Sequence, residues 1–162
     1  MEAPALTSRQ DVARAIAFFE QCDDVMLLHR LSGEIAPRAK QMVGQLIAGG
    51  GEDAIPPPAD LRGAREPATA AQAVAALAAV NDFALLQVLA RGIGQRIETL
   101  EIAASAQFPE GARVLVPTAV AFPPARADQP GTVEATGTML LVRLDNGESW
   151  SGPPSLAQLA PR

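Results

Sequence analysis

Aromatic, cysteine and histidine residues are scarce in this chain of 162 residues. Aromatic side chains make up only 4% of it, with one Trp and no Tyr, and Cys22 and His29 are the only residues of their types. A single cysteine excludes an intrachain disulfide and is typical of a reducing compartment. The first residues also lack the positively charged segment and the apolar segment of a secretory signal. We therefore expect a cytoplasmic protein.

Positive charge is also in short supply. The chain has 13 basic and 18 acidic residues, which gives a net charge of −5 and a pI near 4.8. The deficit extends over the whole chain, because residues 1–107 carry 9 basic and 13 acidic groups and residues 108–162 carry 4 and 5. Proteins that bind nucleic acid without sequence preference present a basic face. The charge pattern therefore disfavours nucleic acid as a partner without excluding it.

Long apolar runs are missing, although 48% of the residues are hydrophobic. The most apolar stretch, residues 68–90, is interrupted by polar residues, and its many alanines make a poor membrane span. It predicts a buried helix and no membrane segment. Because alanine buries little area, at roughly 25 cal/mol per Å², we expect additional burial from a protein partner or from a homo-oligomer.

Apolar residues at helical spacing predict a first pair of helices. Val12 and Phe19 belong to the first helix, and Asp23-Asp24 either continues it or caps the next one. Ser32-Gly33 interrupts the pattern, so the second helix is expected over residues 34–48. Pro37 is tolerated there only in the first turn.

A linker separates this pair from a second pair of helices. Residues 49–67 combine Gly and Pro triplets with mixed charge, which favours a stiff connector over a segment that a partner module reads. Pro67 is expected to open a central helix that extends to about Ala90, and Gly92 and Gly94 to kink or break it. A last amphipathic helix follows, and its expected solvent-facing residues are Arg96, Glu98 and Glu101.

The pattern changes to alternation of apolar and polar residues after Pro109. Strands are expected within residues 112–117, 131–135, 138–144, 148–152 and 155–161. Asn146-Gly147 fits the centre of a type I′ hairpin turn. Five short strands are too few for a sandwich, so we expect a small, bent barrel. The predicted fold class is α+β: a four-helix bundle-like region over residues 1–107, followed by a small barrel over residues 108–162.

The order of motifs in residues 110–160 resembles that of SH3-like small barrels. The motifs are a G-x-x-V-x-V segment that starts at Gly111, a long loop, Gly131-Thr132-Val133, the segment LVRLDNGE, Trp150 and a Pro-marked closing segment. The Gly-Thr-Val segment is similar to the start of the KOW-type barrels of translation and transcription proteins. That resemblance implies RNA contacts from basic and aromatic residues. The matching residues are Arg113, Arg126, Arg143 and Trp150.

Groups with catalytic or metal-binding chemistry are few. Cys22 and His29 are seven residues apart, a spacing that permits one helix face and hence a nucleophilic pair or two metal ligands. The favoured interpretation is a small buried thiol and a surface or interface imidazole. Helix capping or solvation explains Asp23-Asp24 better than metal binding, because adjacent helical side chains point about 100° apart. We therefore predict no catalytic, cofactor-binding or metal-binding residues and no enzymatic activity.

The candidate partner-binding residues lie in the predicted barrel, and they are Trp150, Phe122, Arg126 and Arg143. Trp150 follows the predicted hairpin, where an aromatic side chain can line a peptide groove. Packing inside the barrel is the favoured alternative, because no Tyr accompanies this Trp. Phe122 supplies either a second wall of the groove or a contact with the bundle.

These features favour a non-enzymatic protein-interaction or assembly/adaptor protein, with its helical face and its small barrel as binding surfaces. Small chains that combine a bundle and a barrel occur in multi-subunit bacterial or phage assemblies. Two alternatives remain open. One is a nucleic-acid-associated regulator that uses the KOW-like barrel, and the other is an accessory subunit of an enzyme complex.

Overall fold

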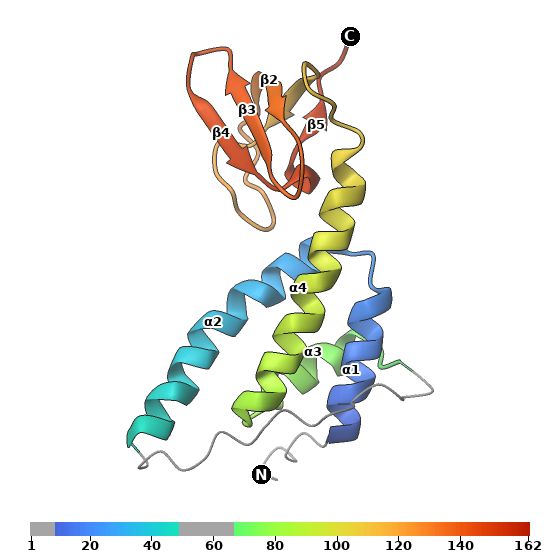
Figure 1. The fold of residues 1–162 in the computed structure, drawn as a ribbon, viewed down its shortest axis with the longest axis vertical. Coiled ribbons are helices and arrows are strands. Elements are labelled where there is room, and N and C mark those ends of the chain that lie inside the picture. The colour runs from blue at the N-terminus through green and yellow to red at the C-terminus, as the bar shows by residue number, and fades with distance from the viewer. Residues whose placement is uncertain (1–8, 49–66) are drawn as a thin grey trace. The chain divides into compact units, whose positions relative to one another are not determined.

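The computed structural model describes residues 9–48 and 67–162, which form four helices followed by a five-stranded antiparallel sheet (Figure 1). The predicted α+β class is therefore confirmed. The chain divides into two compact units, one up to Arg96 and the other from Ile97 onward. This division falls inside the last helix, whereas the predicted boundary at 107/108 follows the change from helix to strand. Most of the predicted linker, residues 49–66, lies outside the described residues.

The first two helices are α1 (Arg9–Gln21) and α2 (Val25–Ala48), and Asp24 caps the second. Asp24 precedes the first residue of α2, and its Oδ1 atom accepts a hydrogen bond from the backbone N–H of Leu27 at 3.0 Å. This side-chain acceptor satisfies one of the N–H groups that the first turn of a helix leaves free. The capping interpretation of Asp24 is therefore confirmed.

We expect Asp24→Ala to destabilise the helical unit by about 1 kcal/mol, because it removes this acceptor from the start of α2. Asp24→Asn keeps a side-chain oxygen in the same place and is the matched control, with little expected loss. Urea denaturation followed by the helical circular-dichroism signal measures both variants. Equal stability of Asp24→Ala and wild type would show that the cap contributes nothing.

Helix α2 runs without interruption through Ser32-Gly33 and contains Pro37. The predicted break, and the predicted start of a new helix at residue 34, are wrong. The apolar stripe explains the continuity, because Leu28 and Leu31 before the expected break and Met42 after it are all buried. Pro37 lacks the N–H that would bond to the carbonyl of Gly33. Both residues are exposed, so water satisfies that carbonyl at little cost.

Helix α3 covers Ala70–Ala79 and begins at a capping box formed by Thr69 and Gln72. The N–H of Gln72 bonds to Thr69 Oγ1 at 3.3 Å, and the N–H of Thr69 bonds to Gln72 Oε1 at 2.9 Å. The two bonds satisfy donors that the first turn leaves free. The predicted central helix, from Pro67 to about Ala90, is therefore wrong in both bounds.

Helix α4 covers Phe83–Ser105 and starts after Asp82, whose Oδ1 atom accepts a hydrogen bond from the N–H of Ala84 at 2.8 Å. It continues through Gly92 and Gly94, so the expected break there is wrong. Ile93, between the two glycines, is fully buried and holds this turn in the core.

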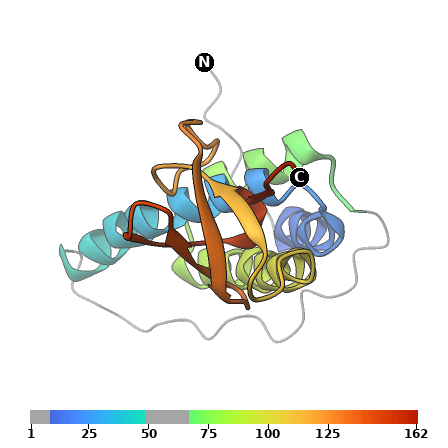
Figure 2. The same ribbon diagram turned by 90° about the horizontal axis from the view of Figure 1, so that it is seen from above.

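The helical unit is held together by apolar side chains and by arginines that bond between its helices. The first part of α4 lies between α1 and α2 in both views (Figures 1 and 2). Arg38 of α2 donates to the carbonyls of Ala78 and Val80 at the end of α3. The largest fully buried side chains of this unit are Val12, Phe19, Leu28, Leu31, Val80, Leu86, Leu89 and Ile93. Within the described ranges, no helix is apolar over the length needed to cross a bilayer.

The second unit contains the last turns of α4 and an antiparallel sheet with the strand order β4-β3-β2-β1-β5. A 3₁₀ helix, η1, lies between the last two strands. The elements are β1 (Arg113–Val116), β2 (Gln129–Ala135), β3 (Leu140–Leu144), β4 (Ser149–Gly152), η1 (Pro154–Leu156) and β5 (Gln158–Leu159). Each strand overlaps a segment in which one was expected, so the five expected strands are confirmed, although β2 begins at Gln129, two residues before its expected start.

The sheet curves strongly (Figures 1 and 2). It buries alternate residues on one face, which we call the inner face. Leu140, Val142 and Leu144 of β3 are buried, whereas Leu141 and Arg143 are exposed. The same alternation continues across the neighbouring strands. The other buried side chains of the inner face include Val114, Val116, Val133 and Trp150.

The hairpin between β3 and β4 has a three-residue loop. The N–H of Gly147 bonds to the carbonyl of Leu144 at 2.9 Å, which places Asp145 and Asn146 at the centre of the turn. The predicted type I′ turn, with Asn146-Gly147 at its centre, is wrong. Gly147 instead follows the turn with a φ of +90°, the left-handed conformation that a three-residue loop needs. Asn146 supports this loop, because its Oδ1 atom accepts the N–H of Glu148 at 2.9 Å.

Candidate functional site

Exposed apolar side chains lie on the outer face of the sheet and directly beside it, near the connection of β2 to β3. Met139 is 49% exposed and Leu141 is 39% exposed. Ala135 is also exposed and lies opposite Leu141 in the register of the two strands. Alternation along β3 places Leu141 on the face opposite to its buried neighbours. We call Ala135, Met139 and Leu141 the outer apolar patch.

Each of the three arginines that the KOW-like resemblance selects is paired with a carboxylate. The guanidinium-to-carboxylate distances are 2.6 Å for Arg113–Asp145, 3.1 Å for Arg126–Asp128 and 3.0 Å for Arg143–Glu134. All three pairs are partly solvent-exposed, so they contribute little to stability. Their effect is on the surface charge, since each positive group lies directly beside a negative one.

Arg113 and Asp145 form a two-pronged pair. Nη1 and Nη2 of Arg113 donate to Oδ1 and Oδ2 of Asp145 at 2.7 and 2.6 Å, and Nη1 also donates to Thr132 Oγ1 at 3.0 Å. The hydrogen bonds to Asp145, aided by the opposite charge, lower the pKa of its carboxyl group and raise the pKa of Arg113. Both groups are therefore ionised at neutral pH, and they tie the β3–β4 loop to β1.

Trp150 lies on the inner face of the sheet and is 7% exposed. A Cβ atom at Gly152 would lie 2.5 Å from both Cζ2 and Cη2 of the indole, so the ring packs directly over that glycine. The same Cβ would lie 3.1 Å from Cγ2 of Val120 in the long loop. The indole N–H is buried and has no acceptor in the described part of the chain. Packing thus describes the position of Trp150, and its role in binding stays a prediction.

The four predicted partner-binding residues do not form one surface. Trp150 lies opposite Val142 on the inner face, whereas Arg143 points to the outer face that carries the apolar patch. Arg126 lies in the loop before β2, where its Nη1 atom also donates to the carbonyl of Leu156 at 3.2 Å. Phe122 is half-buried in the same loop.

Glu101 is a buried charged residue, whereas its charge predicts a position on the solvent side of its helix. It is 2% exposed, so that prediction is wrong. Its Oε2 atom accepts the backbone N–H of Ser155 at 2.9 Å, and its Oε1 atom accepts the hydroxyl of Ser155 at 2.5 Å. The spacing contained the signal, because Glu101 follows Ile93 and Ile97 at intervals of four residues and so shares their face of α4.

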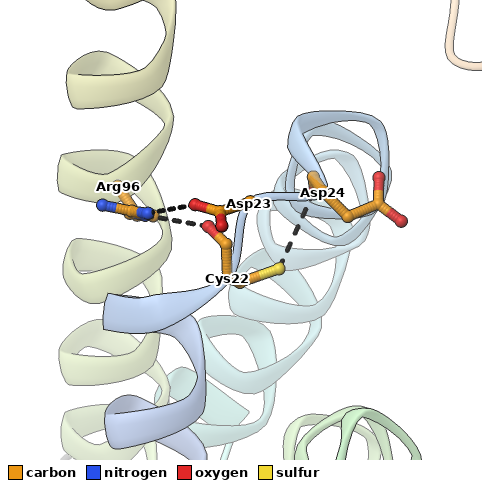
Figure 3. A network of polar contacts seen from close by, with 4 residues as sticks. All are labelled: Cys22, Asp23, Asp24 and Arg96. Carbon is orange, nitrogen blue, oxygen red and sulfur yellow. Dashed lines mark hydrogen bonds and ion pairs between the residues drawn. The ribbon is translucent and has the colours of Figure 1, made fainter.

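Arg96 joins the α1–α2 turn to α4 (Figure 3). Its Nε atom donates to the carbonyl of Cys22 at 2.8 Å, and its Nη2 atom lies 2.6 Å from Oδ1 of Asp23. Figure 3 shows the Asp24 carboxylate pointing away from that of Asp23. The neighbouring carboxylates therefore lack the convergence of a paired metal site, and the network is a structural connection.

Cys22 and His29 do not share a helix face. Cys22 lies in the turn between α1 and α2, whereas His29 lies within α2, so the assumed helical spacing does not apply. Cys22 is buried, and its Sγ atom lies 3.9 Å from the carbonyl oxygen of Asp24. The interpretation of Cys22 as a small buried residue is confirmed. Among the described residues, no group of three or more His, Cys, Asp or Glu could hold a metal ion.

No family model, curated protein or solved structure matches this chain. An inference about its function therefore rests on the physical character of its surface. Among the described residues, the outer apolar patch brings exposed apolar side chains together, with the Arg143–Glu134 pair beside it on the same sheet.

Proposed function

We propose that this protein is a non-enzymatic assembly or adaptor protein of the cytoplasm that binds other proteins through its C-terminal sheet and its helical face. The outer apolar patch carries the proposal. Its largest side chains, Met139 and Leu141, are both exposed and two residues apart, with Leu141 in β3 and Met139 directly before that strand. Apolar side chains rimmed by polar groups are typical of protein-binding surfaces. On the helical unit, Val43 of α2 is also an exposed apolar side chain, with 38% of its surface accessible.

The topology supports the resemblance to SH3-like small barrels. Five short antiparallel strands, the long loop between β1 and β2, and a Pro-marked closing segment that contains η1 agree with the motif order over residues 110–160. Small barrels host many different ligands, so the topology supports an interaction module without selecting its ligand.

Charge favours protein over nucleic acid as that ligand. Residues 108–162 carry 4 basic and 5 acidic groups, a net charge of −1. Arg113, Arg126 and Arg143 each have a carboxylate beside them. A phosphate backbone would meet these carboxylates at every arginine, and the counterion release that drives nucleic-acid binding would be small.

The patch predicts a selective loss of partners in a charged variant. We expect the double variant Met139→Lys/Leu141→Lys to lose at least one protein that co-purifies with the wild-type chain, because two lysines would have to be desolvated in the interface. Ala106→Lys/Gln107→Lys is the matched control, since it adds the same charge at exposed positions outside the sheet. Quantitative mass spectrometry of affinity-purified material compares the three chains.

Two results would contradict the proposal. One is the same set of co-purified proteins, in the same amounts, for wild type and the patch variant. The other is recovery of RNA or DNA that dissociates as salt is raised, which would favour the nucleic-acid-associated regulator. Unchanged thermal unfolding of the patch variant confirms that its fold is intact.

A further inference from the structure

Strand β4 forms an open edge of the sheet. It is the first strand in the order β4-β3-β2-β1-β5 and forms one lateral edge of the sheet in Figure 1. Its side chains at Ser149 and Ser151 are exposed. An edge strand presents backbone groups that have no partner within their own sheet.

The hydrogen-bond pattern shows which groups β4 presents. The N–H of Leu144 bonds to the carbonyl of Glu148 at 2.8 Å, and antiparallel ladders alternate from there. Trp150 and Gly152 therefore direct their N–H and C=O groups toward β3, while Ser149 and Ser151 direct theirs outward. No backbone group in the described part of the chain bonds to Ser149 or Ser151 on that side.

The two edges of the sheet differ in their protection. Edge strands are commonly protected by short length, by lysine, by proline or by a bulge. The opposite edge strand, β5, has only two residues and is followed closely by Pro161. Strand β4 has four residues and contains no proline or charged residue, and Pro153 follows it directly. Strand β4 is therefore the longer of the two edges and offers more outward backbone groups.

We propose that β4 pairs antiparallel with β4 of a second copy of this chain, which joins the two sheets across a two-fold axis at Trp150. This inference rests on the proposed assembly function and names one of its partners. In this register Ser149 lies opposite Ser151 of the second copy, and Ser151 lies opposite Ser149 of the second copy. All four outward backbone groups of each copy are then used, in four hydrogen bonds between the copies.

The charged residues near β4 are compatible with this register. Glu148, the nearest charged residue of the hairpin, lies opposite Gly152 of the second copy. Arg143 is one strand further from the axis and is already paired with Glu134. The pairing therefore brings no like charges together, despite the net charge of −5.

The contact is short, so the association is weak and depends on concentration. Four residues per copy bury much less than the area of a stable interface, and we expect a dissociation constant on the order of 100 μM. Sedimentation velocity over a concentration series that brackets this value shows a monomer–dimer equilibrium if β4 pairs as proposed.

Ser151→Pro tests the edge directly. Its N–H points away from β3, so proline removes an outward donor from each copy without removing a bond of the sheet. We expect the dissociation constant to rise about tenfold or more, because two of the four hydrogen bonds are lost and the ring obstructs the edge. Ser151→Ala keeps the N–H and is the matched control, with unchanged association.

Cross-linking tests the register. In chains that carry Cys22→Ala, we mix a Ser149→Cys chain with a Ser151→Cys chain under mild oxidation. The predicted pair has a Cα separation of about 5.5 Å, within the roughly 4.4–6.8 Å range of disulfides. The mixture should form the disulfide faster than either chain alone or than a mixture with Thr136→Cys, an exposed residue outside β4.

The outcomes separate this inference from the proposed function. A chain that stays monomeric over the series, or a dimer that Ser151→Pro leaves intact, overturns the β4 pairing. Loss of co-purified proteins in Met139→Lys/Leu141→Lys would still uphold the assembly function in that case. If another protein's strand occupies β4, Ser151→Pro removes that protein while the chain alone remains monomeric, and the inference of a second copy is overturned.

Discussion

Gly131→Ala is expected to reduce the free energy of unfolding of the C-terminal unit by about 3 kcal/mol. A Cβ atom at this position in β2 would lie 2.6 Å from Cγ1 of Val142 and 2.7 Å from the carbonyl oxygen of Arg143. Val142 is fully buried and the Arg143 carbonyl belongs to the backbone of β3, so neither can move without disturbing the ladder between the two strands. The substitution therefore forces β2 away from β3 at this close contact.

The single tryptophan makes this prediction measurable. Trp150 lies in the same sheet, so its fluorescence during urea denaturation reports the C-terminal unit. Gly137→Ala is the matched control, because the nearest atom to its Cβ would be the carbonyl oxygen of Met139 at 3.9 Å. If the midpoints of Gly131→Ala and Gly137→Ala agree, the close approach of β2 and β3 at Gly131 does not hold.

Glu101→Ala is expected to destabilise the same unit by about 3 kcal/mol. The side chain is 2% exposed and accepts both the backbone N–H and the hydroxyl of Ser155. Alanine removes both acceptors and leaves the N–H of Ser155 without one in a part-buried place. Glu101→Gln keeps one oxygen for that N–H, and we expect it to lose about 1 kcal/mol.

A double-mutant cycle isolates the contact between Glu101 and Ser155. Ser155→Ala removes the hydroxyl but keeps the N–H, so the losses from Glu101→Ala and Ser155→Ala should sum to more than the loss in the double variant. Ile102→Ala is the control on the same helix, because Ile102 is 52% exposed. Additive losses would show that the hydroxyl bond contributes nothing. A loss at Glu101 no larger than that at Ile102 would show that neither bond to Ser155 stabilises the unit.

The strands were predictable because their signal is local. Alternation along each strand, with glycine and proline at the ends, located all five strands. Helix ends depend on capping side chains, which are also a local signal and outweigh the glycines in this chain. Asp82 starts a helix because its side chain bonds to the N–H of Ala84, whereas Gly33 and Gly92 do not interrupt theirs because buried residues on either side hold the helix in the core.

The surface was less predictable, because it depends on which residues the fold brings together. The pairing of Arg113 with Asp145 joins residues 32 positions apart, so the sequence shows an arginine but not its neutralising partner. Leu140, Leu141 and Val142 are consecutive apolar residues, so the sequence alone does not show which of them faces solvent. The burial of Leu140 and Val142 in β3 leaves Leu141 on the exposed face. Glu101 was the exception, since helical spacing placed it on the apolar face and its charge alone led to the opposite prediction.

Photo-crosslinking from position 141 tests the outer apolar patch as a protein-binding surface most directly. A photoreactive amino acid replaces Leu141 in the full chain, and the same residue at Gln107 serves as the control outside the sheet. We predict a reproducible cross-linked protein of defined mass from position 141, absent from position 107 and lost when Met139→Lys is added. Cross-linked nucleic acid, or the same products from both positions, would contradict the assignment of the patch as a protein-binding surface.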